Sequence, residues 1–161
     1  MLDSHRATPP PALIGALLRM PFETVRERML AGLHERGFSD LVAAHLDVFQ
    51  YPGPEDQRPS DLARHARMTK QAMNYLLGQL EWLGYLTRRA DADDQRYKRV
   101  HLTARGRAAG QAIREIVLGV EADWEQQLGP RRFAHLRELL ECLSAGMSPG
   151  DEGAPASPEQ M

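Results

Sequence analysis

The fold of this chain is decided between Pro59 and Gly110, where the sequence reads PSDLARHARMTKQAMNYLLGQLEWLGYLTRRADADDQRYKRVHLTARGRAAG. Ser60 and Thr69 each stand just before a segment of helical pattern, and hydroxyl side chains in that place commonly cap a helix N-terminus. We therefore expect a helix from Asp61 to His65, a tight turn, and a second helix from Lys70 to about Leu83.

Two strands and a long helix follow the second helix. The segments 85–89 and 99–103 favour strands, and the charged residues 90–98 between them form the tip of a hairpin. Thr103 can then cap a helix from Ala104 to about Leu128. Two helices, a hairpin and a long helix in this order are the parts of a winged helix-turn-helix, whose second helix enters the major groove of DNA.

The second helix has two distinct faces by its spacing. Its apolar residues form a stripe that must pack on the preceding helix: Met73, Leu76, Leu77, Leu80 and Leu83. The opposite side, which we call the reading face, carries Lys70, Gln71, Asn74, Tyr75 and Gly78. Gln71 and Asn74 have amides that can pair with adenine, and Lys70 can reach a guanine edge or a phosphate. Tyr75 offers a hydroxyl to a phosphate, although a helix face of this kind can also be merely solvated.

The hairpin tip adds charged candidates for DNA contact. We expect Asp94 to hold the turn and to orient Arg96, whose guanidinium then enters the narrow minor groove. Arg88, Lys98 and Arg99 are the further basic residues of the hairpin that we assign to DNA. For the aspartates of the tip taken singly, a solvated position is the favoured interpretation.

The charges of the chain are unevenly distributed. The net charge is −2, yet residues 58–107 contain eleven lysines and arginines against five acidic residues, whereas the remainder contains nine against seventeen. A basic segment within an acidic chain is the pattern expected when one part meets phosphates and the rest does not.

The N-terminal part is predicted to be helical after a disordered start at residues 1–10. Residues 11–35 show helical spacing, and Pro21 should either kink this helix or divide it into two abutting helices. Ser39 can cap another helix from Asp40 to about Gln50. We therefore assign residues 11–50 to N-terminal helices and residues 51–103 to the DNA-binding part, in which a short edge strand near Arg58 is also expected.

The C-terminal part, residues 104–147, is predicted to contain the long helix and a final helix from Arg131 to about Met147, followed by a disordered tail at 148–161. The final helix has an apolar face of Phe133, Leu136, Leu139, Leu140 and Leu143. The terminal helices thus carry more apolar surface than a small winged domain can cover, which favours an isologous dimer. The expected fold is mainly α with one small β-hairpin, a DNA-binding domain joined to a helical dimerisation region.

The chain resembles the multiple-antibiotic-resistance regulator (MarR) family of bacterial transcription factors. The resemblance runs from about Leu13 to Leu143 and is carried by SDLARHARMTKQAMNYLLGQLEWLGYLTRR for the reading helices, DADDQR for the wing and VHLTARGR for the start of the long helix. By resemblance, Asp94 and Arg96 are the family's wing pair, and residues 70–75 occupy the base-reading positions. The resemblance implies a ligand-responsive repressor that binds a palindromic double-stranded DNA operator as a homodimer, in the bacterial cytoplasm and at the nucleoid.

An effector pocket is a further expectation. His45 beside Phe49 and Tyr51, with Met20 from the first helix, could line a site for a small aromatic or phenolic molecule. A hydrogen-bonded histidine of the core is the more common role of such a residue. No cofactor is expected, and the six histidines contain no pair at the spacing typical of a metal site.

Other classes of protein remain in view. The single cysteine, Cys142, could make the chain a redox-responsive regulator, although a buried inert thiol on the final helix is the favoured interpretation. A winged helix used only for contact with another protein is the main rival function. An enzyme is not expected, because the sequence has no phosphate-binding glycine loop and no nucleophile or zinc-protease motif. No run of about 18 apolar residues and no signal peptide is present, which favours a cytoplasmic protein without membrane contact.

Overall fold

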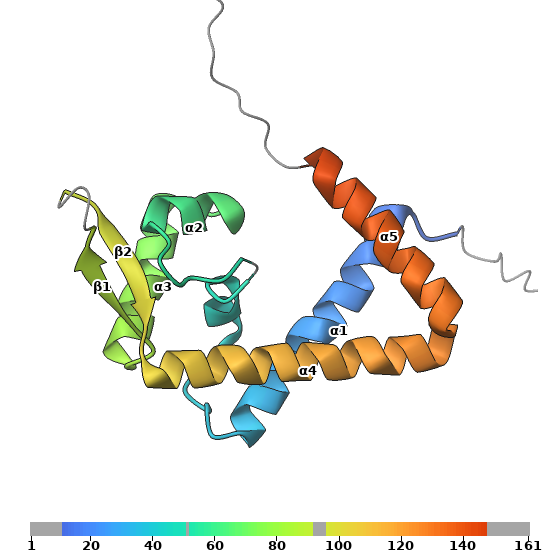
Figure 1. Cartoon of the computed structure of the whole chain (residues 1–161), viewed down its shortest axis with the longest axis horizontal. Coiled ribbons are helices and arrows are strands. Elements are labelled where there is room, and N and C mark those ends of the chain that lie inside the picture. Colours follow the sequence, from blue (N-terminus) through green and yellow to red (C-terminus); the bar gives the residue numbers. More distant parts are fainter. Residues whose placement is uncertain (1–10, 51, 92–95, 148–161) are drawn as a thin grey trace, which may run out of the picture. The chain divides into compact units, whose positions relative to one another are not determined.

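The computed structural model describes residues 11–50, 52–91 and 96–147, and it confirms a mainly helical fold with one hairpin (Figure 1). The elements in chain order are α1 (Ile14–Glu35), the 3-10 helix η1 (Ala43–Asp47), α2 (Pro59–His65), α3 (Lys70–Trp82), β1 (Leu86–Ala90), β2 (Lys98–Leu102), α4 (Ala104–Leu128) and α5 (Pro130–Met147). The chain divides between Val120 and Glu121 into two compact units. Within the described ranges, none of the helices combines the length and apolarity that crossing a membrane requires.

The core of the first unit is built on the apolar stripe of α3. The predicted inward residues Met73, Leu76, Leu77 and Leu80 are buried, and Leu83 is half-buried. They pack with buried residues from each neighbouring element: Met29, Leu33, Leu41, Leu46, Val48, Leu62, Ala63, Tyr85, Leu86, Val100, Ala109, Ala112, Ile113 and Ile116. Each leucine buried in this way contributes about 1.5–3 kcal/mol, so the stripe determines which side of α3 faces outward.

The turn between α2 and α3 follows one of the two predicted caps. Thr69 caps α3, because its hydroxyl accepts a hydrogen bond from the backbone N–H of Ala72 at 3.1 Å. The prediction that Ser60 caps α2 is wrong. The helix begins at Pro59, two residues before the predicted Asp61. The fixed φ of proline suits the first helical position, and its missing N–H needs no partner there. Arg67 takes a left-handed φ of 52°, and this residue makes the turn.

The two strands pair in antiparallel fashion, from Leu86 opposite Leu102 to Ala90 opposite Lys98. Each strand lies one residue away from its predicted range. A third backbone segment joins the free edge of β2, since Asp56 N–H donates to Val100 O at 2.8 Å and Val100 N–H donates to Gln57 O at 2.9 Å. This pairing is close to the edge strand expected near Arg58, but the described residues form only the two strands β1 and β2.

The N-terminal part departs from prediction in two places. The helix α1 continues through Pro21, so the alternative of two abutting helices is wrong. Proline removes only one backbone hydrogen bond here, and the helix is solvent-exposed around it. The predicted helix from Asp40 to Gln50 is also wrong: only Ala43–Asp47 is helical, in a 3-10 turn, and Ser39 does not cap it.

Asp40, the predicted first residue of that helix, is bound by Tyr85 and Arg105. The phenol of the fully buried Tyr85 donates to Asp40 at 2.6 Å, and the guanidinium of Arg105 lies 4.4 Å from the centre of the tyrosine ring. Arg105 also pairs with Asp40 at 2.9 Å. Desolvation acts to raise the pKa of Asp40, but the hydrogen bond from Tyr85 and the charge of Arg105 outweigh it and lower that pKa. Asp40 thus joins its segment to Tyr85 and to Arg105 of α4.

Gly106, in the stretch VHLTARGR, lies where the start of α4 contacts the start of the hairpin. Thr103 caps α4 as predicted, accepting from Gly106 N–H at 3.1 Å, and it donates to the carbonyl of Gly84 at 2.7 Å. The first turn of α4 thereby comes so close to the start of the hairpin that a Cβ on Gly106 would lie 1.9 Å from the carbonyl oxygen of Tyr85. No side chain fits at this position.

The second unit consists of the last part of α4 and of α5. Gly129 lies between the two helices and has a left-handed φ of 81°. The predicted apolar face of α5 forms, but Leu136, Leu139, Leu140 and Leu143 on it remain exposed. Cys142 is exposed as well, so the prediction of a buried thiol is wrong for the single chain, because none of the described residues of α5 is fully buried.

Substitution of Gly106 by alanine should destabilise the protein by about 2 kcal/mol or more, because the new methyl group overlaps a backbone oxygen. Gly110 lies one turn further along α4 and is the matched control. A Cβ there meets no heavy atom of the described residues within 4 Å, so Gly110→Ala should stabilise by about 0.5–1 kcal/mol through helix propensity. Urea unfolding of both variants measures the difference. Equal effects of the two substitutions would contradict the close approach.

Candidate nucleic-acid interface

The reading face of α3 is exposed along its length. Lys70, Gln71, Asn74 and Tyr75 all lie on the solvent side, opposite the buried stripe. Because the helix is anchored through that stripe and capped by Thr69, these side chains project from a rigid element. The structure therefore brings together four of the predicted site residues on one surface.

Trp82 belongs to the same surface and was missed in the sequence. It follows Gly78 by four residues and Tyr75 by seven, and its side chain is 86% exposed. With Asn74, Tyr75 and Gln79 it lines an open hollow of about 670 Å³ beside the reading face. The spacing alone could have indicated Trp82, because it continues the pattern of the reading face into the last turn of α3.

Arg88 is held by an acidic neighbour. Its guanidinium binds both through Nε at 2.9 Å and through Nη2 at 2.7 Å to one oxygen of Glu81, whose other oxygen accepts the backbone N–H of Arg88. Burial acts to raise the pKa of Glu81, yet the hydrogen bonds and charge of Arg88 outweigh it and lower the pKa. Arg88 is thus fixed at the junction of α3 and β1, with part of its charge neutralised.

Asp91 organises the base of the wing. Its carboxylate is only 2% exposed and accepts from Arg58 at 2.9 Å and from Arg99 at 2.9 Å. The expectation of a solvated aspartate is therefore wrong at this position, because two guanidinium groups compensate the burial of the charge. Arg99 further donates to the backbone carbonyl of Asp56 at 2.8 Å, so this predicted DNA contact takes part in the network that holds the wing.

The remaining wing residues lie further out. Arg96 and Lys98 are exposed, and the Arg58 guanidinium lies 4.7 Å from the centre of the Tyr97 ring. Asp94, the predicted support of Arg96, lies outside the described residues. The wing thus presents two predicted basic side chains on a base that Asp91 ties together.

The residues predicted for an effector pocket are not gathered at one site. His45 is buried and lines the hollow beside α3, Phe49 packs against the core, and Met20 is exposed on α1. Tyr51 lies outside the described residues. Neither Phe49 nor Met20 belongs to the wall of the hollow that contains His45.

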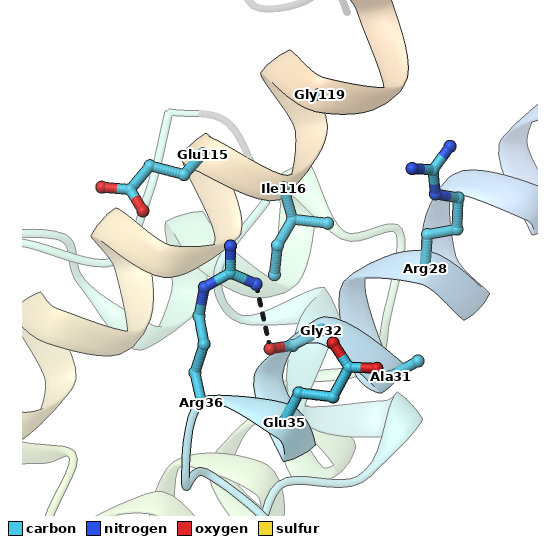
Figure 2. Close-up of a pocket in the computed structure, with 8 residues that line it drawn as sticks. All are labelled: Arg28, Ala31, Gly32, Glu35, Arg36, Glu115, Ile116 and Gly119. Carbon is cyan, nitrogen blue, oxygen red and sulfur yellow. Dashed lines mark hydrogen bonds between the residues drawn. The ribbon is translucent and has the colours of Figure 1, made fainter. Parts of the chain in front are cut away.

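A second hollow lies between α1 and α4, and Figure 2 shows that both positively and negatively charged side chains line it. Its volume is about 360 Å³. Arg36 donates to the carbonyl oxygen of Gly32 at 3.1 Å. Ile116 packs closely against Gly32, since a Cβ added to Gly32 would lie 2.8 Å from Cδ1 of Ile116. Sequence patterns did not indicate this groove, because it depends on where two helices cross.

Among the described residues, no group of three or more histidine, cysteine, aspartate or glutamate side chains is placed to hold a metal ion. The polar groups that converge are those of the reading face and the wing. Both carry donors suited to base edges and phosphates.

Comparison with known proteins places these features in a family. A model described as the MarR family matches residues 50–96. The HTH-type transcriptional repressor Rv2887 of Mycobacterium tuberculosis (strain H37Rv) is 31% identical over 136 residues, which cover 83% of this chain and 95% of the repressor. The repressor Mb2911 of Mycobacterium bovis shows the same identity and coverage.

Solved structures agree with the sequence comparison. The Rv2887 protein in complex with salicylic acid superposes with a TM-score of 0.62 at 29% identity, over 83% of this chain and 97% of that one. MarR of E. coli in its apo form shares the fold at 20% identity, with a TM-score of 0.65 over 84% and 98% of the two chains. The arrangement of the reading helix and the wing and the similarity to these repressors lead to one conclusion: the chain belongs to the MarR family of winged helix-turn-helix transcriptional regulators.

Proposed function

We propose that this protein is a repressor that binds a palindromic DNA operator as a homodimer and is released by a small aromatic effector. The observation that carries the proposal is the reading face of α3. It places Lys70, Gln71, Asn74 and Tyr75 on the exposed side of a helix whose other side is locked in the core. The wing beside it adds the exposed Arg96 and Lys98.

Different residues would serve different parts of the DNA. The side-chain amides of Gln71 and Asn74 each have one donor and one acceptor. These complement the N7 acceptor and the N6 donor that adenine presents in the major groove, so the two residues would read sequence. Lys70 and Tyr75 would meet a guanine edge or phosphates, and Arg96 would enter the minor groove. Arg88, bound to Glu81, and Arg99, bound to Asp91, would act mainly by fixing the surface and adding positive potential.

A homodimer would cover the apolar residues that the single chain leaves exposed. On α1 these include Ile14, Leu17, Leu18 and Phe22, and on α5 they include Leu136, Leu139, Leu140 and Leu143. Apolar surface of this extent is uncommon on a soluble monomer. A two-fold dimer would present two copies of α3 to successive major grooves, about 34–36 Å apart, and would require half-sites about 10 base pairs between centres.

The effector proposal rests on the relative that binds salicylic acid and p-aminosalicylic acid. Two of the hollows formed by the described residues are proposed as sites for a small aromatic acid. The one beside α3 adjoins the reading face, so an occupant would compete directly with DNA. The groove between α1 and α4 carries Arg28 and Arg36, and an occupant there would act without touching the reading face.

A protein-contact function is the alternative, and the exposed Trp82 is the observation that favours it. A large apolar side chain on the surface often marks a site of contact with another protein. The polar character of the reading face around Trp82 favours DNA. Loss of duplex binding on substitution of that face, with the oligomeric state retained, separates the two functions.

Substitution of the wing and of the reading face should have different effects on DNA binding. Arg96→Ala should weaken binding to every duplex and reduce the slope of log K against log salt by about one unit per lost phosphate contact. Asn74→Ala should cost about 1–3 kcal/mol on the preferred sequence and little on others. Titration of labelled duplexes across salt concentrations measures both. Arg131→Ala, an exposed arginine of α5, is the matched control, and equal losses in all three variants would refute the assignment.

Introducing a charge on the apolar face of α5 should separate the dimer. Leu139→Asp places a carboxylate where the proposed interface is apolar, so the scattering mass in solution should fall from two chains to one. Binding to a palindromic duplex should weaken at the same time, since only one half-site is then engaged. Glu138→Ala on the same helix is the control and should remain dimeric. A wild-type protein that is monomeric at micromolar concentration contradicts the dimer.

A further inference from the structure

A line of hydrogen bonds runs from the core to the reading face. His45 is buried behind α3, and its Nδ1 lies 3.3 Å from the backbone nitrogen of Val42. Its Nε2 lies 3.2 Å from the side-chain oxygen of Gln79, and the side-chain nitrogen of Gln79 lies 3.2 Å from the hydroxyl oxygen of Tyr75. The line therefore begins at a backbone amide and ends at an exposed phenol of the reading face.

The direction of each bond in the line follows from its inner end. A backbone N–H can only donate, so Nδ1 of His45 must be unprotonated and accept from Val42. The neutral ring then carries its proton on Nε2, which donates to the oxygen of Gln79. The amide of Gln79 must therefore present its nitrogen to Tyr75, and the hydroxyl oxygen of Tyr75 accepts.

The consequence for Tyr75 concerns its hydroxyl proton. Because its oxygen already accepts from Gln79, its own O–H is directed away from Gln79. The bond also restricts the rotation of a side chain that is 67% exposed and would otherwise be free to turn. The phenol is thus prepared as a donor, which is the role that a phosphate oxygen requires of it.

We propose that Gln79 and His45 are positioning residues that hold the Tyr75 hydroxyl as an outward hydrogen-bond donor for a DNA phosphate. The inference rests on the proposed function and adds to it two residues that do not themselves touch DNA. It also gives a role to the hydrogen bond between the buried His45 and Gln79 of α3.

A double-mutant cycle tests whether the contribution of Gln79 to DNA binding depends on the Tyr75 hydroxyl. The probe is a labelled duplex that the wild-type protein recovers from a random-sequence pool. Tyr75→Phe should weaken binding about tenfold, the value expected for one hydrogen bond to a charged group. Gln79→Met removes the amide at similar length and should weaken binding roughly threefold through lost ordering of the phenol. The double variant should bind as Tyr75→Phe does.

The conservative substitution Gln79→Glu sharpens the test. A glutamate keeps an oxygen for His45 Nε2–H but has no N–H for Tyr75, so the hydroxyl proton turns inward. Gln79→Glu should therefore weaken binding more in the protein with Tyr75 than in the Tyr75→Phe background, where only its charge acts. The proposal would be overturned if, in both cycles, the Gln79 substitution weakened binding by the same factor with Tyr75 as with Phe at that position. A merely structural role of Gln79 does not depend on the hydroxyl.

A spectroscopic measurement separates this inference from the proposed function. Long-range 15N–1H spectra of the histidine rings should show His45 with its proton on Nε2, and Gln79→Met should shift that nitrogen. A proton on Nδ1 would overturn the inference whatever the DNA result. If Tyr75→Phe binds as tightly as the wild type while Asn74→Ala does not, DNA binding stands and the inference fails. A wild-type protein that recovers no duplex contradicts both.

Discussion

The burial of Tyr85 is the constraint on which the first unit depends. Its carbonyl oxygen accepts from Thr103, its phenol donates to Asp40, and its ring lies against the guanidinium of Arg105. Burial, together with the hydrogen bond to Asp40, raises the pKa of Tyr85, so the phenol stays protonated as that donor. One residue thereby joins the end of α3, the start of the hairpin, the first turn of α4 and the segment before η1. The orientation of the reading face relative to the wing follows from this joint.

Acidic residues bind some arginines of the DNA-binding part, and these arginines hold the structure together. Asp91 gathers Arg58 and Arg99 at the base of the wing, and Glu81 fixes Arg88 beside α3. Pairs of this kind add little net stability, because the desolvation of both charges offsets their attraction. The positive potential of the segment is retained in part, and the groups proposed for direct contact, Arg96 and Lys98, are exposed. A basic surface is thus combined with a rigid one.

Local patterns allowed much of this arrangement to be predicted. The stripe of α3, the caps Thr69 and Thr103 and the bounds of α4 depend on residues within a few turns of one another, and the structure confirms them. Asp91 and Asp40 were misjudged because each pairs with an arginine far away in the sequence, Arg58 at 33 residues and Arg105 at 65 residues. Periodicity does not reveal such pairs. Trp82 differs from them, since its helical spacing was visible and only the apolar character of its side chain concealed it.

Dimethyl sulfate footprinting of a bound duplex tests the central claim most directly, because the reagent modifies guanine N7 in the major groove and adenine N3 in the minor groove. If α3 reads the major groove and Arg96 enters the minor groove of a two-fold site, protected guanines should fall in two segments about 10 base pairs between centres. Protected adenines should flank them. A bound duplex with no protected guanine N7, or with one protected segment alone, would contradict the account.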